Sequence, residues 1–535
     1  MFPVARMALI VRDGSRLQHN DYWQMLPRFT DVNGGLDLGG LFTFQNQPVV
    51  IPQIIYWLNM KLFAGSNISL GFVVVLLVLV QLAVVALLLR QSRLGAVESA
   101  LILVVASALL FNLTGTWNFS KSMSGTAWFS ANLFALIAVL LRSRDRSWWA
   151  FLLAVLASMS YGTGLAAWVA VIATGVTRRP SRSAWREWPH VVGFVTTLLW
   201  YQAAGGDSGM TDRTYLDIVR QTAVLLGFVL GLDGALGSAV GLLALVVVPV
   251  LIAALVSTTS AAGWVGVATF GLIATLEVSF GRTVVLQLFG TQDRYSSPPA
   301  VLWLGLFALV LVALRRFGCR SSTADGTERR AASFGRLLPL AVAAPLLVGA
   351  VTAGSTQADE MLALNHPQEL REIALRLDAT DGTAYLIGFF TATSTVTEVM
   401  RANAHHPFVE GWDLDCGLLD TQLDAAEGRP VRRGQGALTS GRPITALPGA
   451  VELSGHLTME LDARCVVIAN EDGVVVGAAT IGAGAGAHPV PASSTRFQAL
   501  ARRGEGAYRA FVVLEGSSDP LLLEGELTAH EVEAA

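Results

Sequence analysis

The residues best suited to chemistry lie in the first long polar stretch of the chain, where Asp21 is followed directly by Tyr22 and Trp23. A carboxylate can act as a general base toward a hydroxyl group. Neighbouring aromatic rings can stack on a sugar. A second polar stretch further along contributes Asn46 and Gln47 as candidate substrate-binding amides. These five residues predict a site for a hydroxylated substrate.

Later polar stretches add charges that complement this acid. They contain three cations that could hold a leaving phosphate, two aromatic residues that could stack on sugar rings, and one further acid: Lys121, Arg282, Arg294, Trp117, Tyr295 and Glu277. Because a carboxylate inside a membrane is costly, we expect Glu277 to face the protein interior, either at the substrate or paired with Arg282. Sugar transfer from a lipid phosphate requires a base for the acceptor hydroxyl and cations that bind the leaving phosphate.

Each of these residues also has a structural interpretation. Asp21 could cap a helix or be a solvated loop acid. Asn46 and Gln47 could cap the segment that follows them. Arg294 and Tyr295 could anchor the chain at a membrane interface, and the cation in the earlier loop could bind lipid headgroups. These alternatives stay open from the sequence.

The composition predicts that these residues are positioned by membrane-spanning helices. The chain has 535 residues, of which 53% are hydrophobic and only 14% charged, against about 25% charged in soluble domains. Apolar runs of about 17–25 residues, long enough to cross a bilayer, recur through the first two thirds. Lys61 and Lys121 are the only lysines, which favours a GC-rich bacterial source. The net charge of -3 gives no reason to expect a nucleic-acid partner.

Basic clusters predict how the helices are oriented. By the positive-inside rule, arginines mark cytoplasmic loops at residues 90–93, 142–146, 178–186 and 315–336. Residues 12–68 then form an outer loop. The apolar stretch 148–176 has basic residues at both ends, so we expect two helices that bend at residues 160–164, where glycines allow a break. In total we expect about eleven transmembrane helices in residues 1–354, in a bacterial plasma membrane.

Residues 355–535 change character and are expected outside the membrane. A helical pattern at residues 365–378 precedes short β-rich runs, among them residues 465–469, 474–478, 510–514 and 521–527. Short strands separated by glycine turns favour a β-sandwich. We expect the histidines 405 and 406 at its surface. Because both Cys416 and Cys465 would face an oxidising compartment, we predict a disulfide between them.

The layout resembles the GT-C superfamily of membrane glycosyltransferases. The resemblance covers roughly residues 15–350. It rests on the element Asp21-Tyr22-Trp23 in the first outer loop, on Asn46 as the retained residue of a second element, and on Asp293-Arg294-Tyr295 in a late outer loop. It implies an inverting transferase that uses a polyprenyl-phosphate sugar, with Asp21 as general base and Arg294 and Tyr295 as contacts for the donor phosphate.

The resemblance also implies the partners: membrane lipid, the lipid-linked sugar, and a cell-envelope glycan or glycolipid as acceptor. No metal site is visible in the sequence, and a need for a divalent ion is left open. Two other classes of function are compatible with the sequence. One is a transporter or flippase of a lipid-linked sugar, and the other is a non-catalytic envelope scaffold whose C-terminal domain binds glycan through aromatics such as Trp412 and Tyr508.

Overall fold

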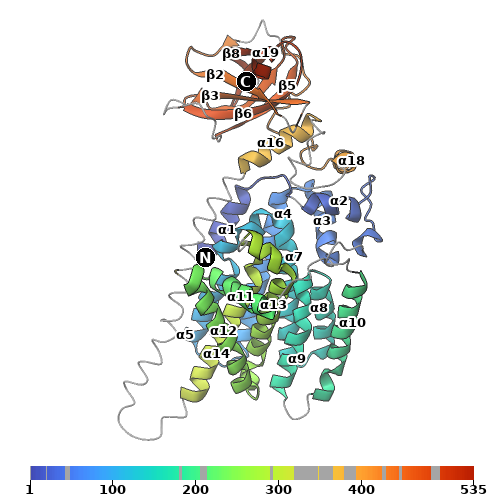
Figure 1. Ribbon diagram of the computed structural model, residues 1–535, viewed down its shortest axis with the longest axis vertical. Coiled ribbons are helices and arrows are strands. Elements are labelled where there is room, and N and C mark those ends of the chain that lie inside the picture. The colour runs from blue at the N-terminus through green and yellow to red at the C-terminus, as the bar shows by residue number, and fades with distance from the viewer. Residues whose placement is uncertain are drawn as a thin grey trace, which may run out of the picture. The chain divides into compact units, whose positions relative to one another are not determined.

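The structure is a computed structural model that describes residues 2–19, 21–42, 49–179, 184–204, 214–289, 293–318, 348, 365–378, 393–423, 429–444, 447, 449–482, 494–517 and 519–534. The chain divides into two compact units, both drawn in Figure 1. Unit 1 comprises Met1–Gly14, Leu38–Tyr56 and Asn67–Leu362, and unit 2 comprises Ser15–Asp37, Trp57–Ser66 and Ala363–Ala535. Much of the predicted outer loop thus belongs to the same unit as the C-terminal part.

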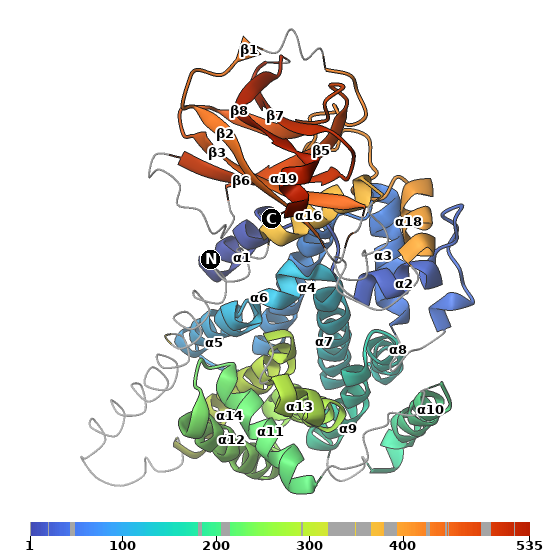
Figure 2. The same ribbon diagram turned by 45° about the horizontal axis from the view of Figure 1, so that its top comes forward.

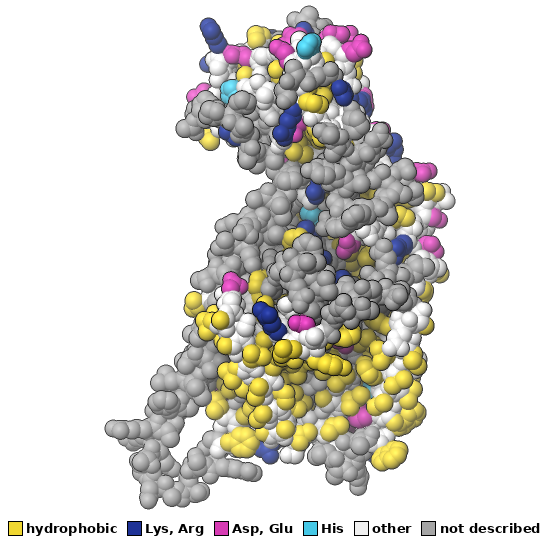
Figure 3. Space-filling view, in the orientation of Figure 1, with side chains coloured by type: hydrophobic (Ala, Val, Ile, Leu, Met, Phe, Trp, Pro, Cys, Tyr) yellow, Lys and Arg dark blue, Asp and Glu magenta, His cyan; other side chains and the backbone are white. Residues whose placement is uncertain are grey.

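Unit 1 is helical. Its helices are α1 (Phe2–Arg12), α4 (Asn67–Leu89), α5 (Ala96–Leu110), α6 (Thr116–Ser120), α7 (Ser122–Ser143), α8 (Ser147–Ser158), α9 (Ala166–Arg178), α10 (Trp188–Ala204), α11 (Tyr215–Phe228), α12 (Gly234–Leu255), α13 (Ala262–Phe289) and α14 (Ser297–Gly318). Helix α3 (Val50–Phe63) begins in unit 1 and ends in unit 2. Hydrophobic side chains cover much of the visible helical surface in Figure 3, as expected for helices that contact lipid.

Five helices among the described residues are long and apolar enough to cross a membrane, which indicates a membrane protein. They are the segments Asn67–Leu89, Ser122–Ser143, Gly234–Leu255, Thr259–Arg282 and Ser297–Phe317. Helices α8 and α9 have 12 and 13 residues, so each is only about 20 Å long against a hydrocarbon core of about 30 Å. The expectation of about eleven transmembrane helices is therefore not confirmed by length and composition among the described residues. The predicted span 337–353 lies outside the described residues, apart from residue 348.

The predicted break in the apolar stretch 148–176 is present. Helix α8 ends at Ser158, the 3₁₀ turn η3 (Gly162–Leu165) follows, and α9 begins at Ala166. Tyr201 of α10 donates a hydrogen bond from its hydroxyl to the carbonyl oxygen of Ser158, and Trp168 donates from Nε1 to the hydroxyl of Ser158 at 3.1 Å. A Cβ on Gly164 would lie 1.9 Å from a backbone carbonyl oxygen of α8, so the turn needs glycine there.

Unit 2 contains an eight-stranded sheet and short helices. The strands are β1 (Arg429–Pro430), β2 (Gly436–Pro443), β3 (Ala450–Thr458), β4 (Ala463–Ala469), β5 (Val475–Ile481), β6 (Ser494–Arg502), β7 (Ala507–Leu514) and β8 (Leu521–Thr528). The helices are α2 (Asp21–Phe29), α16 (Asn365–Arg376), α18 (Thr393–Ala402) and α19 (Ala529–Ala534). The predicted helix at 365–378 and the strands around 465, 475, 510 and 521 are therefore confirmed.

The predicted β-sandwich is wrong, because the sheet closes into a barrel. The strands follow the order β8-β2-β3-β6-β5-β4-β7, and β7 pairs again with β8. Figure 2 shows the strands wrapping around a common core. Val466 and Ile468 of β4 face that core together with Ala510 and Val512 of β7. A strand alternates between two faces in a sandwich and in a barrel alike, so its periodicity does not distinguish them.

The outer face of the barrel is also partly covered. Val467 of β4 and Phe511 of β7 pack there with Leu423 from the segment that precedes the barrel. The predicted disulfide between Cys416 and Cys465 is present and ties this covering segment to β4. Because these strands are buried on both faces, their sequences are almost continuously hydrophobic.

Candidate functional site

A short turn in unit 1 presents Arg294 and Tyr295. They lie in the 3₁₀ turn η6 (Asp293–Tyr295), just before α14. Asn118 of α6 donates a hydrogen bond from Nδ2 to the carbonyl oxygen of Arg294 at 3.1 Å, across 176 residues of sequence. Beside Asn118, the Lys121 ammonium lies 3.1 Å from the ring centre of Trp117, a cation–π contact. Helix α6 and the turn thus bring four predicted residues to one end of unit 1.

Tyr295 packs into a group of aromatic rings. Its ring centre lies 6.0 Å from that of Trp128, edge to face, and Trp128 lies 4.3 Å from Tyr161. The guanidinium of Arg294 lies 5.0 Å from the ring centre of Tyr295. Glu277 precedes Val278, which packs against the same rings. Together, Trp128, Tyr161, Arg294 and Tyr295 are called the Tyr295 cluster below.

Several buried polar atoms of the Tyr295 cluster have no hydrogen-bond partner of regular geometry among the residues that the structure describes. They are Nε of Arg294 and the hydroxyl of Tyr295. The hydroxyl of Ser297, two residues further along the chain, and Oε2 of Glu277 also have no such partner. Tyr295 is 1% exposed and Ser297 is 5% exposed. A buried polar group without a partner costs about 1–3 kcal/mol. A ligand that accepts from Arg294, Tyr295 and Ser297 would remove this cost.

The protonation state of Tyr295 suits a donor. Burial raises the pKa of Tyr295 above its ordinary value, and the charges of Arg294 and Arg282 offset part of that rise. The hydroxyl therefore stays protonated at neutral pH and can donate to an anion. Arg282 thus lies near enough to act on Tyr295 through its charge. The carboxylate of Glu277 accepts a hydrogen bond from the backbone N–H of Ala166 at the start of α9.

In unit 2, Asp21 is exposed and is the first residue of α2. An acid at this position is stabilised by the positive end of the helix dipole. Tyr22 and Trp23 are 0% and 3% exposed, so both rings pack inside unit 2 and neither is open to solvent. The amides expected to bind substrate, Asn46 and Gln47, lie outside the described residues.

The rings of Tyr22 and Trp23 enclose His405. Their ring centres lie 5.6 Å and 5.7 Å from that of the imidazole. His405 and His406 are 1% and 3% exposed, so the expectation that they lie at the surface is wrong. Nδ1 of His405 lies 2.9 Å from the carbonyl oxygen of His406, so Nδ1 carries the proton and donates. Nε2 then accepts from the hydroxyl of Tyr22 at 3.1 Å.

Burial also sets the charge of His405. It lowers the pKa of His405 from 6.5 to about 4, so the ring is neutral at neutral pH. His406 instead pairs with Glu372 at 2.9 Å, and Glu372 accepts from Nε1 of Trp412 at 3.2 Å. Trp412 and Tyr508 are 4% and 3% exposed, so both belong to the interior of unit 2.

The sequence did not single out Trp128, Tyr161 or Asn132 as site residues. Asn132 lies one turn after Trp128 on α7 and is fully buried, and neither polar atom of its side chain has a partner in the described structure. The signal for Asn132 was present in the sequence, as a polar residue inside an apolar span. The aromatic pair carried no such signal, since tryptophan and tyrosine are common near membrane interfaces.

No protein-family model matches the chain, and neither a curated protein nor a solved structure matches it. Among the described residues, no group of three or more His, Cys, Asp or Glu side chains could hold a metal ion.

Proposed function

We propose that the chain is an inverting membrane glycosyltransferase that moves a sugar from a polyprenyl-phosphate donor to a cell-envelope glycan or glycolipid at the outer face of the membrane. One observation carries this proposal. Nε of Arg294 and the hydroxyls of Tyr295 and Ser297 are buried within four residues of sequence, and none of these three atoms has a hydrogen-bond partner of regular geometry in the described structure. Phosphate oxygens are strong acceptors, and arginine is well suited to bind them.

In this mechanism the Arg294 guanidinium and the Tyr295 hydroxyl hold the donor phosphate. The Asp21 carboxylate takes the proton of the acceptor hydroxyl, whose oxygen attacks the anomeric carbon. The bond between that carbon and the phosphate oxygen breaks, and the polyprenyl phosphate leaves with its charge stabilised by Arg294 and Arg282. Attack from the face opposite the leaving group inverts the anomeric centre. Lys121 would contact the donor phosphate, and Trp117 and Glu277 would bind the sugar.

The disulfide gives independent support for the proposed location. A bond between Cys416 and Cys465 persists in an oxidising compartment such as the space outside a bacterial plasma membrane. The proposal accordingly places unit 2, with Asp21, outside the cytoplasm and the membrane helices of unit 1 across the bilayer several times.

The test is sugar transfer by the purified full chain, with a panel of radiolabelled polyprenyl-phosphate sugars and cell-envelope lipid extract as acceptor. Asp21→Asn should lower kcat by about 10²–10⁴-fold, the range for loss of a general base. Asp31→Asn is the matched control, since Asp31 is an exposed acid in the same segment and its side-chain oxygen accepts from Gly35 as an amide oxygen also would. Full transfer by Asp21→Asn excludes this base.

Arg294→Gln tests the donor site separately. It should raise the KM for the lipid-linked donor by at least tenfold and leave the KM for the acceptor unchanged. An equal rise in both KM values would show that Arg294 shapes the fold and does not bind the donor.

A transporter of lipid-linked sugar is the second candidate. One observation favours it: the carboxylate of Glu277 faces the break between α8 and α9 within the helical bundle. Broken helices and buried acids are typical of substrate paths in transporters. Translocation of a lipid-linked sugar in proteoliposomes, lost in Glu277→Gln and without any sugar transfer, would establish this candidate instead.

A further inference from the structure

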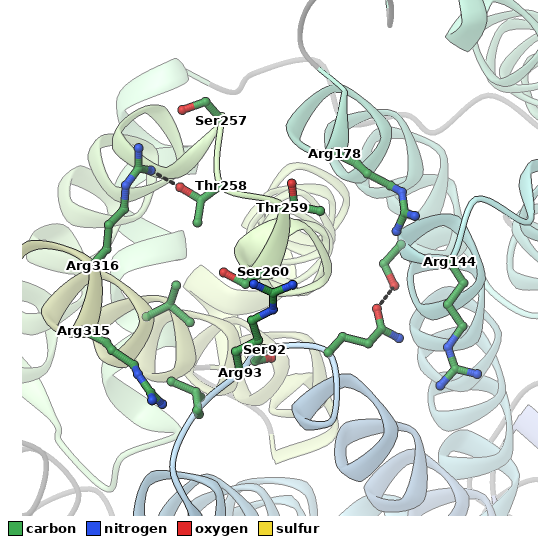
Figure 4. Close-up of a pocket in the computed structure, with 14 residues that line it drawn as sticks. Ser92, Arg93, Arg144, Arg178, Ser257, Thr258, Thr259, Ser260, Arg315 and Arg316 are labelled. Carbon is green, nitrogen blue, oxygen red and sulfur yellow. Dashed lines mark hydrogen bonds between the residues drawn. The ribbon is translucent and has the colours of Figure 1, made fainter.

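A second candidate site lies where α4, α7, α9 and α14 end and α13 begins. These ends surround a cavity of about 900 Å³, which is within the range of ligand pockets. The arginines that line it are Arg93, Arg144, Arg178, Arg315 and Arg316. Figure 4 shows the arginines arranged around this hollow.

The charge of this cavity is strongly one-sided. Five arginines from four separate places in the sequence line it, and its lining contains no acid among the described residues. The nearby carboxylate of Asp145 is shared by Arg142 and Arg179 and lies 3.8 Å from Nε of Arg178. The lining arginines therefore keep an excess of positive charge.

Neutral hydrogen-bond donors accompany the arginines. The hydroxyls of Ser257, Thr258 and Thr259 come from the connection between α12 and α13, and Thr258 accepts from the guanidinium of Arg316. The 3₁₀ turn η5 (Thr259–Ala261) leads directly into α13, so the positive end of a long helix dipole points toward the same hollow. Arginines, hydroxyls and a helix N-terminus are the groups that bind phosphate in proteins.

We propose that this cavity binds a phosphate- or diphosphate-bearing anion, either a soluble one or the headgroup of an anionic lipid. The arginines alone would be explained by the positive-inside rule. That rule concerns the number of basic residues in a loop, however, and does not require them to converge on a cavity. The cavity lies at the C-terminal end of α14, whereas the Tyr295 cluster lies at its N-terminal end. Anion binding in this cavity does not depend on the proposed glycosyltransferase activity.

The experiment uses the full chain in a neutral detergent and measures the binding of inorganic pyrophosphate by isothermal titration calorimetry. The lining variant Arg315→Gln/Arg316→Gln should bind at least tenfold more weakly than the unchanged chain. The control variant Arg90→Gln/Arg146→Gln removes the same charge at the same end from residues that do not line the cavity, and its affinity should stay within twofold. Arg93→Gln serves as a second lining variant if the double variant does not fold.

A second arm identifies the source of the phosphate. The same three proteins are placed in phosphatidylcholine nanodiscs that contain phosphatidylglycerol, and bound lipid is counted by native mass spectrometry. Retention of phosphatidylglycerol that is lost only in the lining variant assigns the cavity to a lipid headgroup. Pyrophosphate binding without such retention assigns it to a soluble anion. Absence of both, or equal losses in the lining and control variants, overturns the proposal.

Discussion

Acidification should weaken the part of unit 2 that surrounds His405. His405 is neutral in the folded chain because burial lowers its pKa from 6.5 to about 4. In the unfolded chain the ring takes up a proton below pH 6.5, so the unfolded state binds more protons between pH 6.5 and 4. The stability that the neutral ring provides is therefore complete above pH 6.5 and is lost as the pH falls toward 4.

The magnitude follows from the two pKa values. One pKa unit corresponds to about 1.4 kcal/mol, so the free energy of unfolding should fall by about 2 kcal/mol at pH 5 and by about 3 kcal/mol below pH 4. Glu369 in the same unit acts in the opposite direction, because burial raises its pKa to about 7 and the folded chain then binds the extra proton. The effect of His405 must therefore be read as a difference between variants.

The assay is hydrogen exchange with mass spectrometry on the full chain in detergent at pH 7 and pH 5, corrected for intrinsic rates. Peptides from α2 and α18 report on the packing around His405. Between pH 7 and pH 5 the unchanged chain should lose about 2 kcal/mol of opening free energy that His405→Phe does not lose. His530→Gln, at an exposed histidine, should leave the change as it is. An equal pH dependence in His405→Phe and the unchanged chain would refute the reasoning.

Three further substitutions test other parts of the structure. Cys416→Ser should lower the stability of the barrel by about 4 kcal/mol, because the bond to Cys465 closes a loop of 49 residues, as measured by hydrogen exchange of the strands. Gly164→Ala should lower the thermal midpoint of the detergent-solubilised chain, because its Cβ would overlap a backbone carbonyl oxygen. Arg142→Met should cost about 3 kcal/mol, the lower end of the range for a broken buried ion pair, because the buried carboxylate of Glu187 loses its guanidinium partner and keeps only His190. This cost is read from the same thermal midpoint.

Matched substitutions serve as controls for two of these. Gly281→Ala should have little effect, because a Cβ there meets nothing within 4 Å. Arg146→Met removes an exposed arginine from the same end of the helices and should change stability by less than about 1 kcal/mol. A thermal midpoint that falls equally in a test variant and its control would contradict the explanation given for that site.

The sequence by itself determined the features that depend on local pattern. Long apolar runs predict membrane helices wherever they occur, and the glycines at residues 160–164 predict the break between α8 and α9. Short β-rich runs separated by glycine turns predict strands such as β4 and β7. The shared polar context of Cys416 and Cys465 predicts their disulfide. In each case the residue types of a short stretch of sequence are enough for the prediction.

Only the tertiary structure decided which distant segments meet. Closure of the barrel depends on β7 and β2 pairing with the same strand, β8, and strand periodicity does not encode that choice. His405 is buried because Tyr22 and Trp23, nearly 400 residues earlier, pack against it. Trp128 joins Tyr295 in the same way, through the packing of α7 beside the turn before α14. The physical reason is that burial is a property of contacts, and contacts between remote segments are set by the packing of whole elements.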